Sequence, residues 1–313
     1  MEPILRAEKL TKRFGELTAN REIDIEIHAG EIHAIAGENG AGKSTLMKML
    51  YGVYQPTAGN LYIDGEKMER WNPTIAREKG IGMVFQDFRL VPAFTILENV
   101  FLSLHSAGWK INKKKLRAEI NRIAAEYHLS VNPDTEVWKL DLGQRQHVEI
   151  LKILLDPQTR VMIFDEPTSG LDGHNMRLTV KLLRQLAAVG KCLLLITHDL
   201  GVIAEMADYV VVMYAGRVVE KGTAEEIFAN PAHPYTIGLM ASKPMVGKKV
   251  DKLYSIPGKV PNPINMPNYC YFKDRCEMCV EGCQGEYPHM IQLSPPHMVS
   301  CYRYYGKEDA QNG

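Results

Sequence analysis

The sequence predicts an α/β fold built around a mostly parallel β-sheet. Two largely apolar runs, 161–164 and 193–197, lack alternation and are typical of strands buried on both faces of such a sheet. Residues 174–188, which lie between them, have the length of the crossover helix that joins two parallel strands. A glycine-rich loop at 37–45 follows an apolar run at 32–36 and precedes a stretch without helix breakers, and this strand–loop–helix order supports the same fold.

Length and charge narrow the class of protein. The chain has 313 residues, which suits one large domain and one small one. It carries 37 Lys plus Arg and 37 Asp plus Glu, so a formal net charge of zero gives no electrostatic reason to expect nucleic-acid binding. Residues 1–6 do not resemble a secretory signal, and no apolar run approaches the roughly 18–20 residues that span a bilayer. We therefore expect a cytosolic protein whose membrane role comes through partners.

Hydrophobic periodicity divides the chain into segments. Residues 4–35 show β-type alternation, which predicts an antiparallel β subdomain leading into the strand before the glycine-rich loop. A further strand at 81–85 ends at Gln86, and helical periodicity then predicts a helical subdomain at about 88–155. Prolines become dense after residue 232, which places a domain boundary there and divides the chain into domains at 1–231 and 232–313.

The glycine-rich loop has the P-loop pattern G-x-x-x-x-G-K-[ST]. Its glycines allow the backbone to fold around a phosphate, and its N–H groups and the following helix N-terminus form an anion cradle. Lys43 can reach the β- and γ-phosphates of a nucleotide, and the Ser44 hydroxyl can bind Mg²⁺. The loop therefore predicts binding of ATP with Mg²⁺. The residues assigned to this nucleotide site are Gly37, Glu38, Asn39, Gly40, Ala41, Gly42, Lys43, Ser44 and Thr45.

Polar residues follow three of the predicted strands at their carboxyl ends, where ligands bind in parallel sheets. Asp165 and Glu166 follow the strand at 161–164, His198 follows the strand at 193–197, and Gln86 follows the strand at 81–85. We assign Mg²⁺ to Ser44, Gln86 and Asp165. Glu166 is the candidate for orienting or deprotonating an attacking water, and Gln86 and His198 complete the γ-phosphate environment.

With these motifs, residues 1–230 resemble the ATP-binding subunit of an ABC transporter. The resemblance implies that 37–45 is Walker A and that Phe14 stacks on the adenine. It also implies that Asp165 and Glu166 are the Walker B aspartate and the catalytic glutamate, and that His198 is the switch histidine. The implied activity is ATP hydrolysis coupled to transmembrane transport.

The resemblance also implies partners. Gln86 matches the Q-loop glutamine that faces the membrane subunit, residues 169–172 match the D-loop, and residues 140–144 match the signature motif. In this family ATP lies between the Walker A of one chain and the signature motif of another. The chain is therefore expected to pair with a second ATPase subunit and with transmembrane permease subunits, peripherally at the cytoplasmic face of the inner membrane.

The signature motif departs from the family pattern. Leu140, Asp141, Leu142, Gly143 and Gln144 occupy it, with Asp141 where a serine is usual and Leu142 where a glycine is usual. A carboxylate facing the γ-phosphate of the partner's ATP would be repelled strongly in a dry site. We therefore predict a heterodimer with one working site, with a homodimer as the alternative. Under a different interpretation, Asp141 turns away and the Gly143 N–H suffices.

Two subfamilies share the resemblance. Residues 80–155 resemble ATPases of sugar and nucleoside importers, whereas the chain from Asp165 onward resembles ATPases of oligopeptide, dipeptide and nickel importers. The C-terminal extension is characteristic of the peptide group, so peptide import is the first hypothesis and sugar or nucleoside import the second. A soluble ABC protein acting on ribosomes or DNA is the third hypothesis, and a subunit that binds ATP but hydrolyses it poorly is the fourth.

Five of the six cysteines crowd into the last fifth of the chain, a pattern that favours metal binding over disulfides in a cytosolic protein. Four thiolates suit either an iron–sulfur cluster or Zn²⁺. The peptide-importer pattern fits Cys270, Cys276, Cys283 and Cys301 and implies a [4Fe–4S] cluster, with Zn²⁺ as the alternative. Cys279 is surplus to this pattern and makes Cys276-x-x-Cys279 an alternative ligand pair.

Overall fold

The structure, a computed structural model, describes residues 2–104, 112–242 and 254–306. Its described strands form two sheets, a four-stranded sheet in the order β2-β1-β4-β5 and an eight-stranded sheet in the order β11-β12-β10-β9-β3-β8-β7-β6. The strands are β1 (Leu5–Phe14), β2 (Leu17–Ile27), β3 (Ile32–Ala36), β4 (Ala58–Ile63), β5 (Glu66–Lys67), β6 (Ile81–Val84), β7 (Val161–Asp165), β8 (Cys192–Ile196), β9 (Tyr209–Tyr214), β10 (Arg217–Thr223), β11 (Ile291–Ser294) and β12 (His297–Val299).

The centre of the larger sheet is parallel, as the apolar runs predicted. Strand β3 pairs in parallel with β8 and β9, and β7 pairs in parallel with β8 and β6. Every residue of β3, β7 and β8 is buried, because helices and the smaller sheet cover both faces. The register places Asp165 opposite Ile196, so the polar residues that follow β7 and β8 emerge at one edge.

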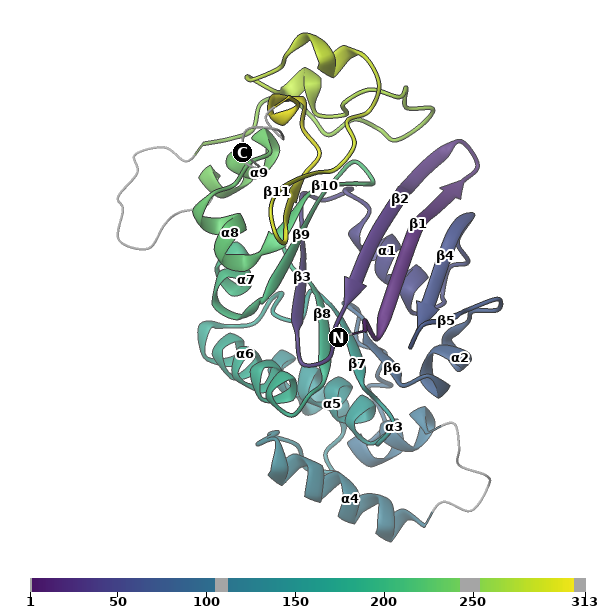
Figure 1. The fold of residues 1–313 in the computed structure, drawn as a ribbon. Helices are drawn as coiled ribbons and strands as arrows, with labels where there is room; N and C mark the ends of the chain where they lie inside the picture. The colour runs from purple at the N-terminus through teal and green to yellow at the C-terminus, as the bar shows by residue number, and fades with distance from the viewer. Residues whose placement is uncertain (1, 105–111, 243–253, 307–313) are drawn as a thin grey trace.

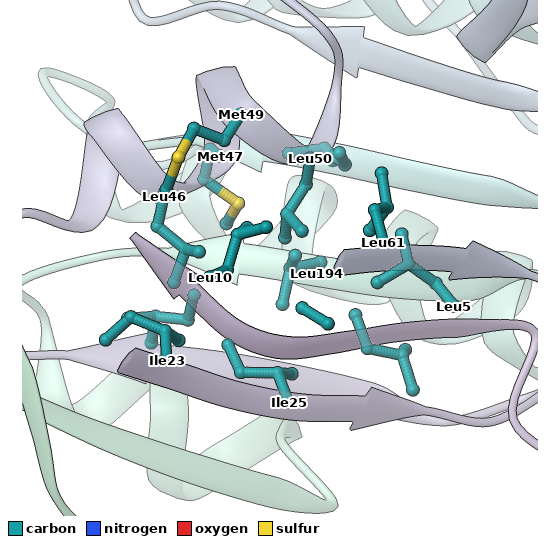
Figure 2. Close-up of a cluster of buried hydrophobic side chains, with 14 of the residues drawn as sticks. Leu5, Leu10, Ile23, Ile25, Leu46, Met47, Met49, Leu50, Leu61 and Leu194 are labelled. Carbon is teal, nitrogen blue, oxygen red and sulfur yellow. The ribbon is translucent and has the colours of Figure 1, made fainter. Parts of the chain in front are cut away.

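The smaller antiparallel sheet packs on the first helix. The described α-helices are α1 (Lys43–Leu50), α2 (Pro73–Glu78), α3 (Ile96–Ser103), α4 (Lys113–Glu126), α5 (Leu142–Leu154), α6 (Gly173–Ala188), α7 (Leu200–Met206), α8 (Ala224–Ala229) and α9 (Pro234–Ala241). Figure 2 shows Leu46 and Met49 of α1 in the same cluster as Leu10 and Ile23 of the sheet. This apolar contact anchors the helix that follows the P-loop.

A helical subdomain lies at the end of the molecule opposite the C-terminal extension (Figure 1). Helix α4 buries Leu116, Ile120 and Ile123, which agrees with the helical periodicity of this part of the sequence. Residues 105–111 of the predicted helical subdomain lie outside the described residues. No helix in the described part of the chain is long and apolar enough to cross a membrane.

The C-terminal extension joins the larger sheet, which its proline-rich sequence did not predict. Strand β12 pairs antiparallel with β10, and β11 pairs with β12. The fully buried carboxylate of Glu220 on β10 accepts hydrogen bonds from the N–H groups of Ala232 and His233, at 2.7 and 2.8 Å, and lies 2.8 Å from His297 Nε2. A buried carboxylate with three partners is a strong attachment, because removing it would leave those partners unpaired.

Candidate nucleotide-binding site

The P-loop joins β3 to α1 and leaves the start of that helix without a side-chain cap. Gly42 is the N-cap residue, with φ +94°, and no side chain bonds to the first-turn N–H groups of α1. A Cβ at Gly42 would collide with the carbonyl oxygen of Ala19 on β2, so both the backbone angle and the space require glycine. The first N–H groups of a helix have no partner within the helix, and here they can bind an anion.

Lys43 lies under the loop. Its Nζ donates hydrogen bonds to the carbonyl oxygens of Gly37, at 2.8 Å, and of Glu38, at 3.0 Å. Burial lowers the pKa of Lys43, and the charges of Glu166 and Asp165 oppose that change. The ammonium group is therefore held at the loop, next to the two carboxylates that follow β7.

The structure brings Ser44 and Asp165 together, although they are 121 residues apart in sequence. The Ser44 hydroxyl donates to Asp165 Oδ1 at 3.3 Å. Burial raises the pKa of Asp165, and the hydrogen bond from Ser44 opposes that rise. A hydroxyl and a carboxylate are oxygen ligands of the type that Mg²⁺ prefers, so the two side chains fit this ion.

Glu166 and His198 are the second pair at this edge. His198 Nδ1 lies 2.9 Å from Glu166 Oε2, and the Glu166 N–H donates to the carbonyl oxygen of Ile196 at 2.9 Å. Glu166 adopts φ +54°, a left-handed backbone conformation that is uncommon for a residue other than glycine. Such strain is frequent at functional sites, and here it places the carboxylate beside the histidine.

Gln86 and Phe14 lie at the periphery of this group. Gln86 is exposed two residues beyond β6, and among the described residues no hydrogen bond joins it to Ser44 or Asp165. Phe14 ends β1 with 42% of its surface exposed. Its ring packs edge-on against Tyr54 at 5.2 Å, and Lys12 Nζ lies over the ring, 5.0 Å from its centroid.

The signature segment starts α5 in a different way. Asp141 Oδ1 accepts the N–H of Gln144 at 2.8 Å, and Gln144 Oε1 accepts the N–H of Asp141 at 3.2 Å, which is a complete capping box. Leu142 is 46% exposed, whereas Gly143 is buried and packs so closely on Asn175 that a Cβ there would collide. The Asp141 carboxylate thus bonds to its own helix.

Sequence reasoning missed three residues that hold the P-loop. Asn20 Nδ2 donates to the carbonyl oxygen of Gly42 at 3.1 Å. The Glu38 N–H donates to Tyr235 Oη at 2.7 Å, and Arg275 binds the Glu38 carboxylate at 2.7 Å. Tyr235 and Arg275 lie 197 and 237 residues from Glu38, and no local pattern connects such distant positions.

The cysteines of the extension lie near one another. Cys270, Cys283 and Cys301 are buried, Cys276 is half-buried and Cys279 is exposed. Burial, with smaller contributions from the neighbouring thiols of Cys283, Cys301 and Cys276, raises the pKa of Cys270 to about 12. Within the described ranges, however, no group of three or more His, Cys, Asp or Glu side chains is arranged to hold a metal ion.

Comparisons with known proteins identify the family. The ABC transporter family model matches residues 20–169, which include the P-loop, the signature segment and both carboxylates after β7. A putative peptide import ATP-binding protein of Brucella abortus is 34% identical over 97% of this chain and 98% of its own length. The chain belongs to the ABC transporter family. A second family model, the C-terminal region of oligopeptide/dipeptide transporters, matches residues 219–283 of this ABC protein.

Other similar proteins match a smaller share of this chain. A ribose import ATP-binding protein of Rubrobacter xylanophilus is 38% identical over 82% of this chain but only 50% of its own length. The chain thus spans about half the length of the sugar-type and nucleoside-type relatives it matches. The structure of a dimeric bacterial ABC transporter cassette is similar with a TM-score of 0.63 and 28% identity, covering 70% of this chain and 98% of that one. The predicted resemblance to both importer groups and the P-loop fold are confirmed.

Proposed function

We propose that this chain binds and hydrolyses ATP and thereby powers the import of peptides through a membrane permease. The observation that carries the proposal is the convergence of two side-chain pairs, Ser44 with Asp165 and Glu166 with His198, beside the uncapped start of α1. A phosphate cradle next to an oxygen-ligand pair and a carboxylate–histidine pair is suited to phosphoryl transfer to water.

Each residue has a role in the proposed reaction. Lys43 and the first N–H groups of α1 bind the β- and γ-phosphates, and Phe14 stacks on the adenine. Ser44 and Asp165 would hold Mg²⁺, which neutralises phosphate charge when it is bound. Glu166 orients the attacking water and accepts its proton, while His198 holds the carboxylate 2.9 Å away in that orientation. Gln86, exposed after β6, would face the permease and would contribute a further oxygen ligand to Mg²⁺.

The choice of peptides rests on the C-terminal half. The oligopeptide/dipeptide region covers 219–283, and the similarity to a peptide import protein extends over nearly the whole of both chains. A sugar or nucleoside is the second candidate, because the ribose import relative has the higher identity, 38% against 34%. That relative is matched over only half its length, so we favour peptides.

We further propose that the chain works in a dimer at the cytoplasmic face of the membrane, attached through permease subunits. The ATP bound at its P-loop then faces the signature segment of a second ATPase subunit. Because Asp141 is a carboxylate bonded to its own helix, this chain offers a poor signature to its partner. A heterodimer whose partner has a serine there gives one competent site; a homodimer would have two poor ones.

We also propose a [4Fe–4S] cluster on Cys270, Cys276, Cys283 and Cys301. Three of these thiols are buried, and all four influence one another electrostatically. A single zinc ion would require four sulfurs about 2.3 Å from one point. A [4Fe–4S] cluster is likewise held by four cysteine thiolates, and the spacing of these cysteines in the sequence supports it, with Zn²⁺ as the alternative.

The ATPase proposal is tested with Glu166→Gln in the full chain. We expect ATP binding to be retained and turnover to fall by at least about a hundredfold, because the proton acceptor is lost. Turnover at the unaltered rate would contradict the assignment of Glu166. The transported solute is tested by reconstituting the chain with permease subunits in liposomes and comparing ATP-dependent uptake of an oligopeptide and of ribose.

The cluster is tested by purification without oxygen, followed by iron, sulfide and zinc analysis. We expect iron and sulfide, and their loss in Cys270→Ser, Cys276→Ser, Cys283→Ser or Cys301→Ser. The matched control is Cys279→Ser, which should keep the metal because its side chain is exposed and surplus to the set. Protein with neither iron nor zinc would contradict the site.

A further inference from the structure

Glu38, the second residue of the P-loop, is held by two elements that lie outside the loop and after the ATPase core. Its N–H donates to Tyr235 Oη on α9 at 2.7 Å. Its carboxylate binds Arg275, whose Nη1 and Nη2 lie 2.7 and 3.2 Å from the two carboxylate oxygens. This two-pronged geometry is the strong form of an arginine–carboxylate pair, and it fixes orientation as well as distance.

Arg275 is itself held in place by the extension. Its Nε donates to the carbonyl oxygen of Pro257 at 2.7 Å, and its Nη1 lies 3.3 Å from Tyr214 Oη. Only 6% of its side chain is exposed, whereas 29% of the Glu38 side chain is exposed. Burial opposes the charged guanidinium, but the hydrogen bonds to Glu38 raise the pKa of Arg275. The extension therefore fixes the position of Arg275, and Arg275 contacts the P-loop through the more exposed side chain of Glu38.

The extension also contacts the β1–β2 hairpin, which carries Phe14 at the proposed adenine end of the nucleotide site. The Thr18 N–H donates to the carbonyl oxygen of Pro263 at 2.8 Å, and Leu17 and Ile264 form an isolated antiparallel bridge. Leu17 is the cross-strand partner of Phe14 in the β1–β2 hairpin. Residues of one extension thus contact both the hairpin that carries the aromatic ring and the loop that surrounds the phosphates.

We propose that the C-terminal extension is part of the ATP site of its own chain and that Arg275 is the residue that positions the P-loop, acting through Glu38. The inference rests on the proposed function of the P-loop. The docked extension favours the loop shape that binds ATP, and ATP favours the docked extension to the same degree, because binding linkage is reciprocal. The extension then has a function in ATP binding in addition to carrying the cysteines.

Removal of Arg275 has two consequences that act in the same direction. The loop loses the contact that orients residue 38, and the Glu38 carboxylate loses its counter-charge next to a triphosphate. Both weaken ATP binding, and neither touches Glu166 or His198, which act on the hydrolytic water. The expected signature is a higher KM for ATP with an unaltered kcat.

The test is a double-mutant cycle on the full chain with Arg275→Ala, Glu38→Gln and both together. We expect Arg275→Ala to raise the KM for ATP about tenfold with kcat within twofold, and Arg275→Lys to recover part of the loss. If Arg275 acts through Glu38, Arg275→Ala raises the KM less in the Glu38→Gln background than in the unaltered chain. The matched control is Lys273→Ala, which removes a neighbouring positive charge that contacts Tyr269 and not the P-loop.

Two results would overturn the proposal: a KM for Arg275→Ala within twofold of the unaltered chain, or fully multiplicative effects in the double variant. Thermal unfolding followed by circular dichroism identifies a variant that fails to fold, in which case Arg275→Lys and Glu38→Gln carry the comparison. Lys43→Ala, measured in parallel, separates this inference from the proposed function. If that variant binds ATP normally, the P-loop assignment itself is wrong.

Discussion

Helices α1 and α5 both begin at a glycine-containing motif, but their first turns are in opposite states. The first turn of α1 follows Gly42 and receives no bond from a capping side chain. The first turn of α5 is closed by Asp141 and Gln144, which satisfy each other's backbone N–H groups. One helix start is therefore prepared for an anion from outside the chain, and the other already holds a carboxylate of its own.

The difference bears on the proposed ATP site between two subunits, in which one supplies the P-loop and the other the signature segment. A helix N-terminus stabilises one negative group at its free N–H groups, and Asp141 occupies that position in α5. The P-loop end has no such internal competitor, and Lys43 adds a positive charge there. This contrast supports the proposal that the chain binds ATP at its own P-loop and depends on a partner for the opposing signature motif.

The largest expected effect comes from removing the charge at the α1 end. Lys43→Ala should weaken ATP binding by about a hundredfold or more, because the ammonium group is the only side-chain cation among the described residues 37–45. Isothermal titration calorimetry of the full chain measures this affinity. Lys67→Ala, on the exposed strand β5, is the control and should leave it unchanged. Equal affinities for the two variants would remove the distinction between the helices.

A smaller effect is expected from opening the α5 end. Asp141→Ser with Leu142→Gly, assayed on the chain alone, should raise ATP turnover severalfold at saturating ATP. The substitution replaces a carboxylate with a hydroxyl that can donate to the γ-phosphate bound by the partner chain. Steady-state phosphate release, with dimerisation verified by light scattering, gives the answer. An unchanged rate in a confirmed dimer would show that Asp141 is harmless and would leave the heterodimer without support.

The smallest effect concerns the stability of the capping box. Asp141→Ala should lower the free energy of unfolding by about 1 kcal/mol, whereas Asp141→Ser should lower it by only a few tenths, because serine also caps helices. Urea denaturation followed by circular dichroism measures the difference. If Asp141→Ala were as stable as the unaltered chain, the carboxylate would not hold the start of α5, and it would not compete there with the phosphate of a partner's ATP.

Local patterns predicted the parts of the fold and site that depend on nearby residues. The apolar runs gave β7 and β8, the glycine spacing gave the P-loop, and the polar residues at strand ends gave Asp165, Glu166 and His198. The pairing of β12 with β10 was not predicted, because the short strands β11 and β12 lie in a proline-rich segment without clear alternation.

The contact between Arg275 and Glu38 was missed for a related reason. It joins positions 237 residues apart, and the cysteines on either side of Arg275 predict metal binding rather than a contact with the P-loop. The sequence also could not predict the hydrogen-bond partner of Asp141, since aspartate is equally suited to cap its own helix and to approach a partner. Only the geometry of the Gln144 bond distinguishes these roles for the isolated chain.

The most direct test of the contrast between the two helices is amide hydrogen exchange of the full chain, with and without ATP and Mg²⁺, at concentrations below dimerisation. We predict that ATP slows exchange at residues 38–48 of the P-loop and α1, and leaves exchange at residues 141–150 of α5 unchanged. Protection of 141–150 with none at 38–48 would contradict the assignment of ATP to the uncapped helix of this chain.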